Sequence, residues 1–256
     1  MACRKQNLHN HTRHSDGRFP VDDLLDAAVS AGLEGIGISD HFFTSKVFRG
    51  HARDVWMKTV WPRYLADIAR AKMESLQRRP GLKVWRGIEI DTCFARVGLE
   101  IHALPWSEIN TLDYVLLEYV GEEESGGMST AKLPLLRTFC NVPIILAHPH
   151  IERLERAFPL ENFFEILRMN SIALELPAGS RNKWFWGRRD VSPLRRVPVT
   201  IGVDLHDDLS EVGALSSTLE FIDKNDLGKQ LADPDSLKSP AQVFSKNDNC
   251  VKASII

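Results

Sequence analysis

Histidine and acidic residues recur along this chain at the ends of short apolar segments that look like β-strands. Six of the nine histidines take part, and they alternate with carboxylates in the order His9, His11, Asp16, His41, Glu89, His102, His148, Asp204 and His206. Imidazole and carboxylate are the side chains that bind borderline and hard divalent cations. The pattern predicts a fold in which several strand ends meet around metal ions.

Two pairs of these residues have the spacing of an extended strand. His9 and His11 are separated by one residue, and so are Asp204 and His206, which follow the apolar run 197–203. Residues two apart on a strand point to the same side, so both members of a pair can reach one centre. A single His-x-His pair is more often a surface or core feature, and the metal interpretation therefore depends on the other segments.

Three further apolar runs end in residues of the same kind. The runs 35–38, 85–88 and 143–147 lead into His41, Glu89 and His148. Packing alone would put aliphatic side chains at such positions. The repetition favours a multinuclear metal site over a set of unrelated core histidines. Asp40 precedes His41 and points the opposite way on an extended chain, which predicts a supporting role for it.

The same residues resemble the motifs of the PHP (polymerase and histidinol phosphatase) domain family. The matching motifs stand in the family's order: His9-Asn10-His11-Thr12, Ser15-Asp16-Gly17, Ser39-Asp40-His41, Gly87-Ile88-Glu89, Ala147-His148-Pro149 and Gly202-Val203-Asp204-Leu205-His206. The resemblance implies an α/β fold, a distorted seven-stranded (β/α) barrel that is TIM-barrel-like. It also implies two or three divalent ions (manganese, iron or zinc) and the hydrolysis of phosphoesters.

The resemblance further implies how the ligands are shared. One ion would lie among His9, His11, Glu89 and Asp204, a second among Asp16, His41 and His206, and a third among Glu89, His102 and His148. Glu89 would then bridge two ions. A bridging carboxylate keeps two cations about 3.5 to 4 Å apart, so that they can share one hydroxide nucleophile.

The third ion needs a ligand from the middle of the chain, and two residues could provide it. His102 follows the apolar residues 99–101, a place where only some branches of the family carry a histidine. Other branches take this ligand from a histidine at the end of the next strand, but the strand predicted at 113–120 contains none. His102 is therefore the preferred ligand, and Glu118 is the reserve.

Length and composition agree with a single α/β domain. A chain of 256 residues with 43% hydrophobic residues is ordinary for one α/β barrel. Residue periodicity predicts helices at 21–31 and 61–79, and strands at 100–104, 113–120 and 171–176. We expect the barrel over 1–232 and, over 233–256, a C-terminal extension that forms a helix end and a loose tail of the same domain.

Charge and cysteine usage bound the partners and the compartment. The formal net charge of −2 gives no global basic field, so no extended nucleic-acid surface is expected, and small phosphorylated substrates fit better. Cys3, Cys93, Cys140 and Cys250 form no C-x-x-C pair, which argues against a disulfide framework or a zinc knuckle. There is no apolar signal segment or membrane-length stretch, and we expect a cytoplasmic protein without membrane partners.

A basic and aromatic segment at 179–189 follows the strand predicted at 171–176. Arg181 and Lys183 are the predicted contacts to the substrate phosphate, because a guanidinium fork suits phosphate geometry. The neighbouring Trp184, Phe185 and Trp186 either stack on a substrate ring or cover the rim of the barrel. Rival phosphate contacts lie near the metal motifs: Arg13, Arg18 and Arg49.

The predicted function is a metal-dependent phosphoesterase that hydrolyses a small phosphate ester by a metal-bound hydroxide. Its substrate class includes histidinol phosphate, nucleotides and short oligonucleotides, and no side chain is predicted as the nucleophile. Two alternatives stay open: an amidohydrolase-like metal hydrolase of C–N or lactone bonds, and a non-catalytic PHP module. Asp16, His41 and His206 argue against the amidohydrolase-like alternative, because they would bind an additional ion that such hydrolases normally lack. Gaps in the ligand set would favour the second.

Overall fold

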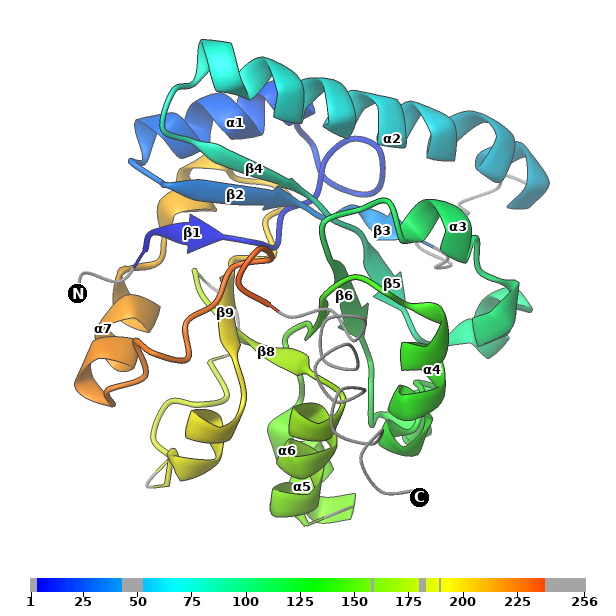
Figure 1. Cartoon of the computed structure of the whole chain (residues 1–256), viewed down its shortest axis with the longest axis vertical. Coiled ribbons are helices and arrows are strands. Elements are labelled where there is room, and N and C mark those ends of the chain that lie inside the picture. Colours follow the sequence, from blue (N-terminus) through cyan, green and yellow to red (C-terminus); the bar gives the residue numbers. More distant parts are fainter. Residues whose placement is uncertain (1–3, 43–52, 158, 180–182, 189, 238–256) are drawn as a thin grey trace, which may run out of the picture.

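The computed structural model describes residues 4–42, 53–157, 159–179, 183–188 and 190–237, and these form a mixed α/β fold of parallel strands (Figure 1). One sheet has the order β1 (Gln6–Asn7), β2 (Gly35–Ile38), β4 (Lys83–Arg86). The other has the order β3 (His41–Phe42), β5 (Glu89–Asp91), β6 (Val115–Glu118), β7 (Ile144–Leu146), β8 (Ile172–Pro177), β9 (Val199–Gly202). The predicted α/β class with parallel strands is confirmed.

The two sheets are joined by hydrogen bonds at both of their junctions. The amides of Gly87 and Glu89 donate to the carbonyls of Ile38 and Asp40, where β2 leads into β3 and β4 into β5. The amide of Leu8, just after β1, donates to Ile201 of β9. The described residues contain nine strand segments rather than the seven that were expected. Residues 39–40 separate β2 from β3, and residues 87–88 separate β4 from β5.

Alternate strand residues pack in two separate buried clusters, which fixes the direction of the side chains at the strand ends. On β6, Val115 and Leu117 belong to the larger cluster, beneath the helices. Leu116 belongs to the smaller one, with Trp85, Tyr114 and residues of β7 and β8. Residues two apart share a face, so Glu118 follows Leu116 on the side of the smaller cluster. The site lies on this same face.

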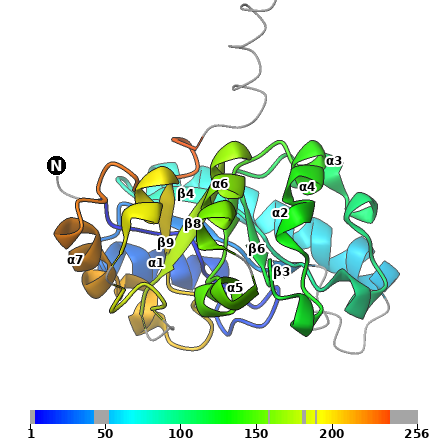
Figure 2. The same cartoon turned by 90° about the horizontal axis from the view of Figure 1, so that it is seen from below.

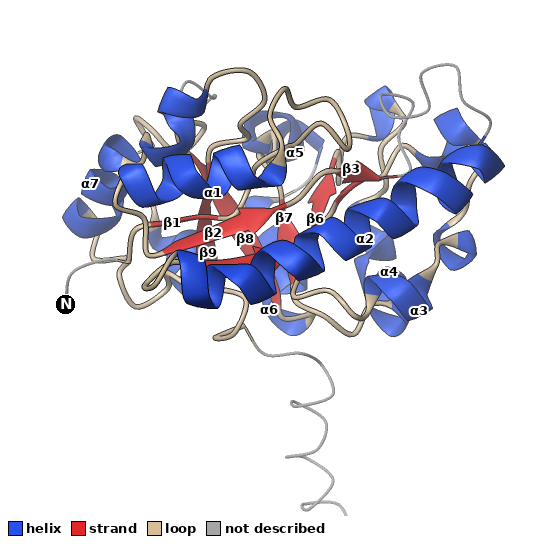
Figure 3. Cartoon of the chain, turned by 90° about the horizontal axis from the view of Figure 1, so that it is seen from above, coloured by secondary structure: helices blue, strands red, loops and turns tan. Residues whose placement is uncertain are grey.

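Helices surround the strands (Figures 2 and 3). They are α1 (Val21–Ser30), α2 (Arg53–Arg78), α3 (Trp106–Ile109), α4 (Leu133–Phe139), α5 (Ile151–Ala157), α6 (Leu160–Met169) and α7 (Ser216–Lys224). The helix predicted at 21–31 is confirmed: its buried face packs on the sheet, and Gly32 follows with a left-handed φ of 67°. The helix predicted to begin at 61 begins earlier, at Arg53, and Pro62 lies inside it.

The strand predicted at 100–104 is wrong. Residues Ile101–Ala103 form a short 3-10 helix, and Leu104 then leads toward α3. Ile101 and Leu104 are buried three residues apart, which is the spacing of a 3-10 turn, while His102 between them is exposed. The strands predicted at 113–120 and 171–176 are found as β6 and β8.

The first residues of the expected C-terminal extension pack against the sheet rather than forming a helix. Asp233 accepts a hydrogen bond from Arg4 at 2.7 Å, and Asp235 accepts one from the indole of Trp85 at 3.1 Å. Leu237 is buried in the smaller cluster. The rest of the extension, 238–256, lies outside the described residues. No helix in the described ranges is both long enough and apolar enough to cross a membrane.

Candidate metal centre

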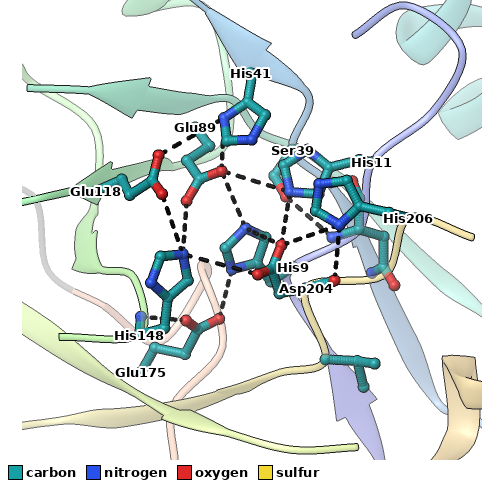
Figure 4. A network of polar contacts seen from close by, with 12 residues as sticks. His9, His11, Ser39, His41, Glu89, Glu118, His148, Glu175, Asp204 and His206 are labelled. Carbon is teal, nitrogen blue, oxygen red and sulfur yellow. Dashed lines mark hydrogen bonds and ion pairs between the residues drawn. The ribbon is translucent and has the colours of Figure 1, made fainter. Parts of the chain in front are cut away.

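The ligand residues predicted from the sequence converge at the carboxyl ends of the strands, with one exception (Figure 4). Their side chains form four groups in which the ligand atoms lie within 4.8 Å of one another: His11, Asp16, His41 and His206; His9, Glu89 and His148; His9, His11 and Asp204; His41, Glu89 and Glu118. The groups share members, so they make one continuous cluster. The exception is His102.

Glu89 lies at the centre of this cluster. Its Oε2 is 2.9 Å from Nδ1 of His41 and 3.3 Å from Nε2 of His9, and its Oε1 is 3.3 Å from Nε2 of His148. The carboxylate is fully buried. Because its two oxygens face different histidines, Glu89 has the geometry of a carboxylate that bridges neighbouring cations.

The loop after β1 and the segment after β9 supply the other side of the cluster. Asp204 Oδ1 lies 3.1 Å from Nε2 of His11, and Asp16 Oδ1 lies 3.3 Å from Nε2 of His206. Asp40 holds the loop that carries Asp16, because it accepts hydrogen bonds from the Thr12 amide at 2.7 Å and the Ser15 hydroxyl at 2.6 Å. The carboxylate of Asp40 thus faces this loop, as its predicted supporting role requires.

The structure does not bring His102 to the cluster, contrary to its place as the preferred ligand. His102 lies on the 3-10 helix with its side chain 67% exposed, and its Nδ1 is 3.3 Å from Glu100. The reserve residue Glu118, at the end of β6, lies at the cluster instead. Its carboxylate is buried, 3.9 Å from Nε2 of His148 and 4.0 Å from Nδ1 of His41.

Backbone conformations that are rare for residues with side chains occur at the site. His148 has a φ of 24°, Asp204 of 56° and Tyr119, directly after Glu118, of 62°. Such conformations cost on the order of 1–3 kcal/mol each and persist only where the surroundings enforce them. At Asp204 the amide is bound to the carbonyl of His9 at 2.9 Å. Three strand ends are therefore held in strained turns that direct carboxylates and imidazoles inward.

Three buried polar residues that support the histidines were missed by the sequence reasoning. Asn7 accepts hydrogen bonds from the amides of His9 and Val203, and Asn10 donates to the carbonyl of Gly37. Glu175 on β8 lies 2.9 Å from Nδ1 of His9. The available signal was a single acid inside the apolar run 172–177 and the asparagines that flank His9.

The cluster holds opposite charges in a buried place. Burial acts to lower the pKa of His148, but Glu89 and Asp204 raise it to about 9. Burial and the neighbouring His41 lower the pKa of His11 to about 3. Burial would raise the pKa of Glu89, yet His9 and His41 hold it well below its usual range. The positive charge of protonated histidines therefore balances the carboxylates. Bound divalent cations would supply this positive charge in place of the protons.

The donor set fits divalent metal ions. Nε2 of His9, both ring nitrogens of His11 and both carboxylate oxygens of Glu89 are buried, and within the described part of the chain they have ion-pair contacts but no hydrogen bond. Buried polar atoms without a partner are destabilising, and native structures satisfy nearly all of them. Imidazole nitrogens and carboxylate oxygens at one point are what zinc, manganese and iron bind.

The predicted phosphate contacts are not assembled at the cluster by the described residues. Arg181 and the rival Arg49 lie outside these residues, and Lys183 donates to the hydroxyl of Ser217 at 2.7 Å. Trp184 and Phe185 are buried, and the ring of Phe185 packs on Phe221 at 4.5 Å. These two aromatic rings therefore pack against the protein itself. This agrees with the interpretation that they cover the rim and do not stack on a substrate ring. The other rivals, Arg13 and Arg18, are exposed near the metal motifs.

The fold is an α/β fold, and the histidines and carboxylates clustered at its strand ends form a candidate metal centre. The family model of the PHP domain matches residues 7–137, and the chain belongs to the PHP domain family. No curated protein matches the chain.

Several solved structures share the fold, including two that cover most of this chain. One is a histidinol phosphate phosphatase from Lactococcus lactis subsp. lactis Il1403, complexed with zinc, L-histidinol and phosphate. It has a TM-score of 0.52 and 17% identity, over 85% of this chain and 93% of that one. The other comes from an archaeal ribonuclease P with mature tRNA, with a TM-score of 0.50 and 12% identity, over 98% of this chain and 94% of that one.

Proposed function

We propose that this protein is a metal-dependent phosphoesterase that hydrolyses a small phosphate ester. The observation that carries the proposal is the cluster around Glu89, in which ligand atoms of His9, His11 and Glu89 are buried and make no hydrogen bond with one another in the described residues. The similar phosphatase structure, with its zinc and phosphate, supports both the ions and the substrate class. Histidinol phosphate, a nucleotide and a short oligonucleotide are the candidate substrates.

We assign two or three ions of manganese, iron or zinc to the cluster. The ions would be shared among the four groups of the cluster: His11, Asp16, His41 and His206; His9, Glu89 and His148; His9, His11 and Asp204; and His41, Glu89 and Glu118. The interrupted strands and the bond from Leu8 to Ile201 support a distorted seven-stranded barrel, which would fix these groups on rigid strand ends. Glu118 closes the one gap in the ligand set, which argues against a non-catalytic module.

When bound, such ions polarise phosphoryl oxygens and lower the pKa of water. The residues of the chain then have three tasks. Glu89 and Asp204 set the spacing and balance the charge, and the histidines present their nitrogens from fixed strand ends. His148 and His206 are the partly exposed histidines of the cluster, so the substrate would enter beside them. No protein nucleophile is required.

The free thiols favour a reducing compartment. Cys93 and Cys140 are buried and unpaired. Burial and neighbouring Asp91 raise the pKa of the Cys93 thiol to about 12, and burial raises that of Cys140 to about 11. These thiols support the cytoplasm as the place of action.

Metal dependence is the direct test of the proposed function. Protein stripped with a chelator and reloaded with manganese, iron or zinc should hydrolyse an aryl phosphate, and renewed chelation should abolish the activity. Metal content and phosphate release are measured on the same samples. Reloaded protein that takes up ions yet stays inert on phosphomonoesters and phosphodiesters would contradict the enzymatic proposal.

The choice between Glu118 and His102 has its own test. Glu118→Ala should lose about one equivalent of metal, because its carboxylate lies between His41 and His148. His102→Ala is the matched control and should keep the wild-type metal content, since the His102 side chain is 67% exposed. Elemental analysis after dialysis measures both. The opposite pattern, with metal lost only from the His102 variant, would restore His102 as the ligand.

A further inference from the structure

A buried carboxylate that belongs to none of the four candidate ligand groups lies behind His9 and His148 (Figure 4). Glu175 stands in the middle of β8, and its side chain is 1% exposed. Its Oε1 is 2.9 Å from Nδ1 of His9, and its Oε2 accepts a hydrogen bond of 2.6 Å from the amide of His148. One side chain thus binds two residues that come from different strands.

The contact to His9 decides which ring nitrogen can bind a metal ion. An ionised carboxylate only accepts hydrogen bonds, so the hydrogen of the His9 ring is assigned to Nδ1. Nε2 would then be the nitrogen that offers its lone pair to a bound ion, and it lies 3.3 Å from Glu89 and 3.5 Å from Asp204. A carboxylate behind a metal-binding histidine fixes the ring in this tautomer and raises its basicity.

The contact to His148 acts on the main chain. His148 has a φ of 24°, which is unfavourable for a residue with a side chain, and Pro149 follows it. The hydrogen bond from its amide to Glu175 ties this turn to β8. Held in this turn, the ring places Nε2 3.3 Å from Oε1 of Glu89. Glu175 therefore sets the direction from which His148 approaches.

The neighbouring strand leaves room for this carboxylate. Gly202 on β9 lies beside β8, where it pairs with Pro177. A Cβ atom at Gly202 would come within 1.6 Å of Oε1 of Glu175 and within 2.6 Å of Cβ of His9. The absence of a side chain at Gly202 is thus a condition for the contact between Glu175 and His9.

We propose that Glu175 is a positioning residue for the ion held by His9, Glu89 and His148. It fixes the tautomer of His9 and the main chain at His148, so that both rings present Nε2 to one ion. The assignment rests on the proposed metal binding of the cluster. It gives β8 a part in the metal centre although β8 supplies none of the candidate ligands.

Zinc binding to Glu175→Gln tests the assignment. Glutamine has nearly the same volume, but its single oxygen can accept from His9 or from His148, and its amide would face the other donor. We expect the affinity for one zinc equivalent to fall about 10- to 100-fold, with the other equivalents unchanged. Competition with a chelator measures the affinity. In NMR spectra of zinc-loaded, ¹⁵N-histidine-labelled protein, the Nδ1–H signal of His9 should shift or disappear.

Thr200→Val is the matched control. Thr200 pairs with Glu175 in the register of β8 and β9, it is buried, and its hydroxyl makes no hydrogen bond within the described residues. The substitution removes a buried hydroxyl at the same level of the sheet and changes neither partner of the contact between Glu175 and His9. We expect wild-type zinc affinity and an unchanged His9 signal.

The outcomes separate this assignment from the proposed function. If wild-type protein binds zinc and Glu175→Gln keeps both its affinity and its His9 signal, the positioning role is overturned and the metal centre stands. If wild-type protein takes up no manganese, iron or zinc, the proposed function fails and this role fails with it. Should Glu175→Gln not fold, Glu175→Asp is measured in its place. Its carboxylate is one methylene too short to reach both partners, and unchanged zinc affinity there would equally overturn the role.

Discussion

Glu89→Gln is expected to lower the rate of aryl phosphate hydrolysis by about a thousandfold or more and to weaken metal binding with it. Glutamine keeps the volume of Glu89 but removes the negative charge that faces His9, His41 and His148. A bridging carboxylate offsets the charge of two cations, and a loss of about 4 kcal/mol of transition-state stabilisation corresponds to about a thousandfold in rate. Metal content and kcat/KM of the purified variant are measured together.

Glu100→Gln is the matched control for this experiment. Glu100 is the same residue type in an exposed position, with its side chain 77% exposed and 3.3 Å from His102. We expect no change in metal content or rate. A Glu89→Gln variant that keeps its full metal content and loses less than about tenfold in rate would place Glu89 outside the ligand set.

The members of the candidate metal cluster could be predicted where the ligand residue comes shortly after an apolar strand. His148 and Asp204 lie at such ends, and parallel strands bring their carboxyl ends to the same edge of a sheet. The pairs His9 with His11 and Asp204 with His206 were predicted from the alternation of a strand. Both pairs reach the cluster, but they lie beyond the ends of β1 and β9, and Asp204 has a left-handed φ of 56°.

His102 shows where local pattern misleads. Residues 99–102 alternate between apolar and polar side chains, which is the signature of a strand with one buried face. The segment turns instead into a 3-10 helix, because Ile101 and Leu104 both reach the core. A run of four alternating residues is too short to distinguish the two conformations.

Glu118 and Glu175 depend on information that is not local. Each lies two residues after a small-cluster residue, Leu116 or Ala173, and therefore on the inner face of its strand. Which face is inner depends on the pairing of all the strands, and the contact of Glu175 to His9 joins residues that are 166 positions apart. The sequence shows an acid inside an apolar run, whereas its partner is determined only by the assembled sheet.

Gly202→Ala is expected to destabilise the fold and to disturb the metal centre at once. The added Cβ would lie 1.6 Å from Glu175 and 2.6 Å from Cβ of His9, so the side chain of Glu175 or the backbone of β9 has to move. Overpacking of a buried site costs typically 1–3 kcal/mol, and we expect the upper end of that range. For a domain of this size that is a fall of roughly 6–12 °C in the unfolding midpoint. Thermal unfolding of the metal-free protein measures it.

Gly32→Ala separates steric overlap from the loss of glycine itself. Gly32 has a left-handed φ of 67° at the end of α1, and an added Cβ would meet no atom within 4 Å. Its cost is only the strain of that conformation, about 1 kcal/mol, and the metal centre is untouched. The Gly202 variant should therefore lose more stability than the Gly32 variant and, unlike it, lose zinc affinity as well. Equal losses of stability with full zinc affinity in both would mean that β9 adjusts without displacing Glu175, and that the contact to His9 tolerates a side chain at position 202.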